Sequence, residues 1–362
     1  MTDPGRAGWL QLTLTPGLGA ATLRKLLAQF GLPENVLAAR RADLGRYLSS
    51  EAIQALDSRP VADAVTQAIA WMQAPGHALV ALGDPEYPRL LLETADPPTV
   101  LYCRGRTDLL NRPALAVVGS RNATAQGASN AEQFSRSFSE SGLTIVSGLA
   151  QGIDAAAHRG GLAGPGSTIA VLGTGVDNLY PAANARLAAE IAERGLLVSE
   201  FPLGTKPLAF NFPKRNRVIS GLARGCLVVE AALASGSLIT ARTAVEQGRE
   251  VFAIPGSIHS PLAKGCHALI KTGAKLVESA EDVLSELSGL RPAAAATGAR
   301  TAGTPRPTDS PLLACMGFDP IDVDTLCALA KLPAERVAAD LLQLELAGRV
   351  SLLPGGLYQR ID

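Results

Sequence analysis

The feature that most constrains the fold is an alternation of short apolar runs with segments of helical length, which begins at residue 113 and continues to about residue 277. Continuous apolar strands that alternate with helices are typical of a parallel sheet covered on both faces. Gly142 and Gly195 follow two of the helical segments, as is usual at helix C-termini. We therefore predict a doubly wound, Rossmann-like, mainly parallel α/β domain. The expected strands are 115–118, 144–146, 168–172, 197–199, 226–229, 251–254 and 275–277.

The segments that flank this pattern differ from it. Residues 290–311 are dominated by Ala, Pro, Thr and Gly without hydrophobic periodicity, which predicts a flexible linker. The turn 15–19 and the amphipathic segment after it resemble a helix-hairpin-helix, and the pattern of residues 334–358 resembles a winged helix. The predicted division is a small helical domain at 1–80, the α/β domain at 81–289, the linker, and a winged-helix-like domain at 312–362.

Several classes of protein are disfavoured by the sequence. No stretch approaches the roughly 18 apolar residues of a membrane helix, and the N-terminus has no secretory pattern, so we expect a cytoplasmic protein without a membrane partner. The five cysteines form no C-x-x-C pair, and the four histidines lack the spacing of metal ligands. We therefore predict free thiols and no bound metal.

The formal net charge is zero, but the charges are unevenly distributed. With 33 basic and 33 acidic residues, the chain is not coated for binding nucleic acid. No acidic residue lies between Glu200 and Glu230, whereas two lysines and three arginines do. This is a local electropositive segment in a neutral protein. Its cations are Lys206, Lys214, Arg215, Arg217 and Arg224.

Three small, polar loops follow predicted strands and should meet at the carboxyl edge of the sheet, where doubly wound folds bind ligands. In the first, a glycine would let a phosphate approach the backbone and an arginine could hold its oxygens. A plain turn with a surface arginine is the alternative. The other two loops offer hydroxyls and amides at helix starts, so together they are typical of a polyanion site. The predicted residues are Gly119, Ser120, Arg121, Ser147, Gly148 and Ser237.

The sequence gives less support to a cofactor site or a catalytic site than to a polyanion site. The first loop lacks G-x-G-x-x-G and no acidic residue ends the next strand, which argues against NAD, so no cofactor is predicted. Asp154 and His158 lie four residues apart on one predicted helix, but no G-x-S-x-G precedes them. A capping and packing role is favoured for this pair, and no catalytic residue is predicted.

The segment 211–217, NFPKRNR, is the most informative stretch. Lys214, Arg215 and Arg217 could contact phosphates, while Phe212 and the preceding Phe210 could stack on bases. Stacking tolerates any base, which suits the binding of single strands. The alternative is a solvated basic loop whose phenylalanines face the core.

Several long segments, in a fixed order from about Asp84 to Val277, resemble the DNA-processing protein A (DprA, also called Smf) family. A nucleotide-processing enzyme such as the lysine-decarboxylase-like phosphoribohydrolases is the alternative, but SGSLITARTAVE matches its P-G-G-x-G-T-x-x-E stretch poorly. The segments that carry the resemblance are GSR at 119–121, SGLAQGIDAAAH at 147–158, TIAVLGTGVDNLYPAAN at 168–184, SEFP at 199–202, FPKRNRVISGLA at 212–223, SGSLITARTA at 235–244 and GREVFAIPGS at 248–257.

The resemblance implies a non-enzymatic protein that binds and protects single-stranded DNA and helps to load the RecA recombinase during natural transformation and recombination. It implies a sterile-alpha-motif-like N-terminal domain and a homodimer formed through His267, Ile270 and Leu276. The acidic balance of 312–362 favours a protein contact rather than DNA there. The residues implied to contact DNA are Gly119, Ser120, Arg121, Ser147, Gly148, Phe212, Lys214, Arg215 and Arg217.

Overall fold

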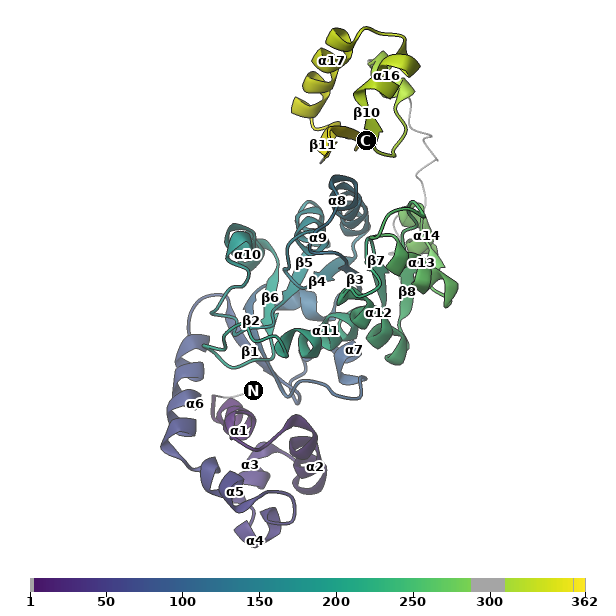
Figure 1. The fold of residues 1–362 in the computed structure, drawn as a ribbon. Helices are drawn as coiled ribbons and strands as arrows, with labels where there is room; N and C mark the ends of the chain where they lie inside the picture. The colour runs from purple at the N-terminus through teal and green to yellow at the C-terminus, as the bar shows by residue number, and fades with distance from the viewer. Residues whose placement is uncertain (1–2, 288–309, 354, 362) are drawn as a thin grey trace.

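The computed structural model describes residues 3–287, 310–353 and 355–361. Figure 1 shows helices at the amino-terminal end, a central sheet flanked by helices, and a small carboxyl-terminal unit. Most of the predicted linker, 290–309, lies outside the described residues. Within the described ranges, no helix is long and apolar enough to cross a membrane.

The central sheet confirms the predicted α/β fold. Its strands follow the order β1-β2-β6-β5-β4-β3-β7-β8-β9, and all neighbouring pairs from β6 to β9 in this order are parallel. The seven predicted strands are found within one residue of their expected bounds. They are β3 (Ala114–Val118), β4 (Thr144–Ser147), β5 (Thr168–Val171), β6 (Leu196–Ser199), β7 (Gly225–Val228), β8 (Glu250–Ala253) and β9 (Lys275–Leu276).

Helices cover both faces of the sheet, which explains why its strands are apolar on both sides. Along β3, Val117 packs in a core with the first group of helices, whereas Val118 packs in another core with the second group. Figure 1 shows α8 and α9 on one side of the sheet, and α11 and α12 on the other. The first includes α8 (Ala125–Glu140), α9 (Ile153–Leu162) and α14 (Ala280–Glu286), and the second includes α11 (Asn211–Gly221), α12 (Ser237–Glu246) and α13 (Lys264–Lys271).

Two strands extend the sheet beyond the prediction. β1 (His77–Ala81) and β2 (Val100–Gly105) pair with each other, and β2 pairs with β6, in both cases antiparallel. The predicted domain boundary at residues 80 and 81 therefore falls inside β1. The proline-rich sequence between the two strands obscures their pattern in the sequence. Within that segment, the Tyr87 hydroxyl donates to the carbonyl of Pro98 at 2.6 Å.

The amino-terminal region is helical, as predicted. Its helices enclose a core that includes Leu12, Leu23 and Leu26. Gly17 has a φ of 80°, so the turn between the first two helices needs a residue without a side chain. Trp9 lies outside this core and packs in a cluster with Leu79 of β1, and this contact joins the helices to the sheet. The helices are α1 (Asp3–Leu14), α2 (Ala20–Phe30), α3 (Pro33–Ala38), α4 (Arg41–Leu44), α5 (Ser50–Leu56) and α6 (Arg59–Met72).

The carboxyl-terminal unit has the arrangement of a winged helix. Its three strands follow the order β10-β12-β11, and the turn before β12 contains Gly355 and Gly356, both with positive φ. A small core with Leu326, Val337 and Leu341 holds the helices against this sheet. The elements are α15 (Pro311–Cys315), β10 (Ile321–Asp322), α16 (Val323–Ala330), α17 (Ala334–Leu346), β11 (Val350–Leu353) and β12 (Leu357–Arg360).

The strand order places one crevice at a defined point of the sheet. From β3 the chain builds outward to β4, β5 and β6 on one side, and to β7, β8 and β9 on the other. The loops that follow β3 and β7 therefore diverge, and the crevice between such loops is where doubly wound folds bind ligands.

Candidate nucleic-acid interface

A crevice of about 670 Å³ opens at this switch point. The loop after β3 lines it with Gly119, Ser120 and Arg121, and the loop before α12 lines it with residues that include Ser237. The first turns of α11 supply Phe212 to the same crevice. The structure thus brings together residues from three predicted segments that lie far apart in the sequence.

Gly119 is required here for a reason other than phosphate access. A Cβ atom at this position would lie 2.6 Å from Cγ1 of Ile153 and 2.9 Å from the carbonyl oxygen of Glu230. The adjacent Ser120 amide donates to that carbonyl at 2.7 Å. The absence of a side chain therefore lets the end of β3 pack against both α9 and the end of β7.

Arg121 and Phe212 form the centre of the crevice. Arg121 is exposed, and the carbon of its guanidinium lies 5.7 Å from the centroid of the Phe212 ring. A Cβ on Gly173 would lie 2.8 Å from Cδ1 of Phe212, so that glycine makes room for the ring. A cation and a half-buried aromatic ring therefore lie side by side, where one nucleotide could use both.

Tyr180 extends the aromatic surface, and the sequence interpretation did not include it. Its ring centroid lies 5.8 Å from that of Phe212, at an interplanar angle of 49°. The side chain is 46% exposed. Its signal in the sequence was weak, because it stands in the loop 172–184 with no cation beside it.

A second pair of a cation and a ring lies at the start of α11. Phe210 is 61% exposed, and the Lys214 ammonium nitrogen lies 5.6 Å from the centroid of its ring. Lys214 itself is exposed. These two residues follow the alternation expected of a surface that binds both phosphates and bases.

Arg215 lies beneath the crevice. Only 5% of the residue is exposed, and Nη1 donates to the carbonyls of Gly148 at 2.5 Å and Val171 at 2.6 Å. Burial lowers the pKa of the guanidinium to about 10. The arginine therefore joins the ends of β4 and β5. It also lines the floor of the crevice, with its guanidinium carbon 5.9 Å from the centroid of the Phe212 ring, and the DNA contact expected of it stays a prediction.

Ser147 and Gly148 also form hydrogen bonds within the protein. The Ser147 hydroxyl is fully buried and donates to the carbonyl of Val117 at 2.6 Å. The Gly148 amide donates to the Asp154 carboxylate at 3.1 Å, and a Cβ on this glycine would meet the guanidinium of Arg215. These groups are already bonded within the protein, so they brace the loop from inside.

Arg217 lies apart from the crevice, although the sequence placed it in the same set. Its guanidinium forms an ion pair with Glu200 and a second with Asp96 at 3.3 Å. Its side chain is 18% exposed. The arginine therefore ties α11 to the loop before β2, and its charge is balanced there.

Ser237, the first residue of α12, lines the crevice, although only 9% of the residue is exposed. Its hydroxyl oxygen lies 2.7 Å from that of Ser235, and its amide donates to the Ser235 hydroxyl at 3.3 Å. Nearby, Ile239 is 43% exposed and lines the same crevice. This side of the crevice offers small hydroxyls beside an apolar surface.

Asp154 and His158 take part in internal hydrogen bonds. His158 is fully buried; its Nε2 accepts from the Leu149 amide at 3.2 Å, and its Nδ1 lies 2.7 Å from the Thr168 hydroxyl. Burial lowers the pKa of His158 to about 3, and burial raises that of Asp154. This agrees with the packing role favoured by the sequence.

The buried imidazole predicts an acid sensitivity. The pKa of His158 is depressed from an ordinary value of 6.5, so the unfolded chain binds one more proton below that pH. The stability that depends on neutral His158 is complete above pH 6.5 and falls as the pH drops toward 3. We expect a loss of about 2 kcal/mol between pH 7.5 and pH 5, measured by urea unfolding. A His158→Asn variant should show a smaller difference between the two pH values; an equal difference would contradict the assignment.

The residues expected at a dimer interface lie at one edge of the sheet. β9 is the terminal strand in the order, and its Leu276 is 42% exposed. Ile270 on α13 is half-buried against the core. His267 is also half-buried, and its Nε2 lies 3.0 Å from the carbonyl oxygen of Gly256.

Comparisons with known proteins agree with this architecture. Residues 78–288 match the family described as DNA recombination-mediator protein A, and residues 291–356 match the DprA winged helix domain. Protein Smf of Escherichia coli strain K12 is 45% identical over 306 residues, which cover 82% of this chain and 81% of that protein. The DNA processing protein DprA of Streptococcus pneumoniae is 54% identical over 200 residues, covering 55% and 71%.

Two solved structures show the same fold. The X-ray structure of DprA from Streptococcus pneumoniae matches with a TM-score of 0.65 and 42% identity, and the match covers 79% of this chain and 98% of that one. The structure that describes a single-stranded DNA binding mode of DNA processing protein A from Helicobacter pylori matches with a TM-score of 0.53 and 30% identity, covering 58% and 96%. Because the family match spans more than half of the sequence and the Escherichia coli relative is covered over most of its length, the chain belongs to the family of DNA recombination-mediator protein A.

Proposed function

We propose that this chain binds single-stranded DNA in the crevice between the loops that follow β3 and β7. The observation that carries the proposal is the half-buried ring of Phe212 with the exposed cation of Arg121 beside it. A base can stack on the ring only when its face is free, whereas in a duplex both faces are covered by neighbours. The crevice therefore favours an unpaired strand.

The charges around the crevice support this binding mode. Arg121 and Lys214 are exposed, so they are available to phosphates. The carboxylate of Glu230 accepts from the amide of Thr124 at 3.0 Å and from its hydroxyl at 2.6 Å, which reduces its repulsion of a polyanion. The phosphates of the bound DNA on either side of the stacked base would then contact Arg121 and Lys214.

A role without catalysis fits the state of the acidic and basic groups. Asp154 is 7% exposed and accepts from two main-chain amides, while His158 is fully buried. Asp154 lines the crevice, where its Oδ2 accepts from these two amides, and the buried His158 is not among the residues that line it. We propose that the protein acts in the cytoplasm, protecting the strand and handing it to the RecA recombinase, as membership of a recombination-mediator family supports.

A selectivity titration tests this function. Fluorescence anisotropy would measure the affinity for one labelled single strand, and unlabelled duplex, AMP and NAD would then compete with it. We expect the single strand to bind roughly tenfold or more tightly than the duplex of equal length, because only the former offers free base faces. Tighter binding of AMP or NAD than of the strand would instead favour a nucleotide-processing enzyme.

We also propose that the working unit is a homodimer formed at the β9 edge, through His267, Ile270 and Leu276. An edge strand leaves backbone groups available to a second chain, and the exposed Leu276 adds an apolar contact. Two crevices joined in this way would bind one strand with higher avidity.

The dimer is tested by placing a charge at the edge strand. Leu276→Glu should give a folded monomer in sedimentation velocity at micromolar concentration, because a buried carboxylate opposes association. Leu346→Glu is the matched control, since that leucine is 81% exposed on the winged-helix unit, and it should remain a dimer. An unaltered protein that already sediments as a monomer would refute the dimer.

A further inference from the structure

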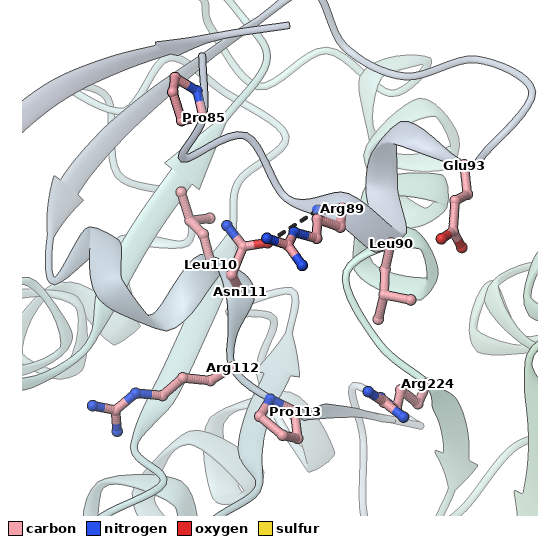
Figure 2. A pocket seen from close by; sticks show the side chains of 9 residues that line it. All are labelled: Pro85, Arg89, Leu90, Glu93, Leu110, Asn111, Arg112, Pro113 and Arg224. Atoms are coloured by element: carbon pink, nitrogen blue, oxygen red, sulfur yellow. Dashed lines mark hydrogen bonds between the residues drawn. The ribbon is translucent and has the colours of Figure 1, made fainter. Parts of the chain in front are cut away.

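A second cavity, of about 510 Å³, lies at the opposite edge of the central sheet from the crevice. Pro113, which precedes β3, and Arg224, which precedes β7, line it from the amino ends of these strands. Arg89, the first residue of α7 (Arg89–Leu92), and Asn111, the last residue of η1 (Thr107–Asn111), line its other side. Figure 2 shows these side chains around the cavity. None of the residues predicted from the sequence to contact DNA lines this cavity.

The cavity carries an excess of positive charge. Arg89, Arg112 and Arg224 line it together with a single acid, Glu93. Arg112 is paired with Asp108 at 2.9 Å, and its guanidinium is directed away from Arg89 and Arg224 in Figure 2. The carboxylate of Glu93 lies 3.6 Å from Arg249.

Two arginines are therefore left to act on the cavity. Among the described residues, neither Arg89 nor Arg224 has an ion-pair partner within 4.0 Å, and both are exposed. Two like charges that face one cavity repel each other, and an anion between them removes that repulsion.

The backbone around the two arginines is held in place. The Arg89 amide donates to Oδ1 of Asn111 at 3.1 Å, and the side-chain amide of Asn111 donates to the carbonyl of Glu86 at 2.9 Å. The Arg224 amide donates to the carbonyl of Ala114 at 2.9 Å. The two side chains therefore extend from fixed points, which limits the ordering needed when a ligand binds.

The lining also indicates which part of a ligand is recognised. It contains prolines and leucines but no aromatic ring, so it provides no surface on which a base could stack. Guanidinium groups hold phosphate oxygens through paired, charge-assisted hydrogen bonds. The volume lies in the range of sites that bind small molecules of nucleotide size.

We propose that this cavity binds a phosphate group through Arg89 and Arg224, with Asn111 as the positioning residue for Arg89. The phosphate belongs either to a nucleic-acid backbone or to a free phosphate compound, and the site does not distinguish single strands from duplexes. This site is separate from the crevice and does not depend on strand binding there.

Calorimetric titration with pyrophosphate and with a short duplex tests the proposal. All proteins in the comparison carry Arg121→Ala and Phe212→Ala, so that the crevice is disabled and its function does not influence the result. Arg89→Gln with Arg224→Gln is added in one protein. In the matched control, Arg46→Gln removes an exposed arginine from the amino-terminal helical region, and Arg242→Gln removes one from α12.

We expect pyrophosphate to bind the crevice-disabled protein, and the pair of substitutions at Arg89 and Arg224 to weaken it by roughly tenfold for each arginine. The control pair should leave the affinity within about twofold. A parallel loss of duplex affinity identifies a nucleic-acid backbone as the ligand, whereas a loss with pyrophosphate alone identifies a free phosphate compound. The proposal is overturned if pyrophosphate does not bind, or binds equally well without Arg89 and Arg224.

Discussion

Replacing Phe212 by Ala is expected to weaken binding of a single-stranded oligonucleotide by roughly 5- to 150-fold, because base stacking on one aromatic ring is worth about 1–3 kcal/mol. The half-buried ring lies beside Arg121 and Tyr180, so its removal takes away the face on which a base would stack. Fluorescence anisotropy at fixed salt measures the loss.

The salt dependence separates stacking from charge. Phe212→Ala should leave the slope of log affinity against log salt unchanged, because no phosphate contact is lost. Arg121→Ala should flatten that slope by roughly 0.7 for its one phosphate. Phe318→Ala is the matched control, since that ring is 55% exposed and also has a guanidinium carbon, that of Arg360, 5.1 Å from its centroid. Equal losses from Phe212→Ala and Phe318→Ala would show that the crevice is not the binding site.

Arg215→Met is expected to lower the free energy of unfolding by about 3–5 kcal/mol, since it removes a buried charge that others depend on. The carbonyls of Gly148 and Val171 would lose their shared donor, and the buried carboxylate of Asp154 would lose its nearby positive charge. Urea unfolding of the variant beside the unaltered protein measures the difference.

The same substitution at an exposed site provides the comparison. Arg121→Met should change the unfolding free energy by less than about 0.5 kcal/mol, as is usual for surface positions, while still weakening strand binding. If Arg215→Met instead kept full stability and lost only its affinity for the strand, Arg215 would be a DNA contact, as the sequence first suggested.

The parallel part of the sheet could be predicted because its strands are buried on both faces. Runs such as Ala114–Val118 are apolar throughout, which marks them clearly between helical segments. β1 and β2 lack this signal, since His77 interrupts the first and Arg104 the second, and they enclose a proline-rich loop. Their pairing is antiparallel and joins the sheet to the amino-terminal helices, a relationship that only tertiary packing defines.

The site could be located from the sequence, but the direction of each side chain could not. Phe212 and Arg215 are three residues apart, so they lie on the same face of α11, which is the face toward the sheet. Lys214 points outward to solvent, and Arg217 reaches Glu200 and Asp96 instead. Residues 211–217 contain three cations and one aromatic ring, which the sequence predicts to form a single surface. The helix instead places them at the surface, in the interior and in an ion-pair network.

Tyr180 shows a further limit. It stands 32 residues before Phe212 in the sequence and reaches it only because the loop after β5 folds over the same edge as α11. No local pattern connects the two rings.

Photochemical crosslinking tests the central claim most directly. An oligonucleotide that contains iodouracil would be bound to the full-length protein and irradiated, and the crosslinked peptides would be identified by mass spectrometry. We expect the crosslinks at Phe212 or Tyr180, where a base would stack in the crevice, and we expect them to disappear with Phe212→Ala. Crosslinks confined to peptides outside the crevice, unchanged by Phe212→Ala, would contradict the binding of single-stranded DNA at this site.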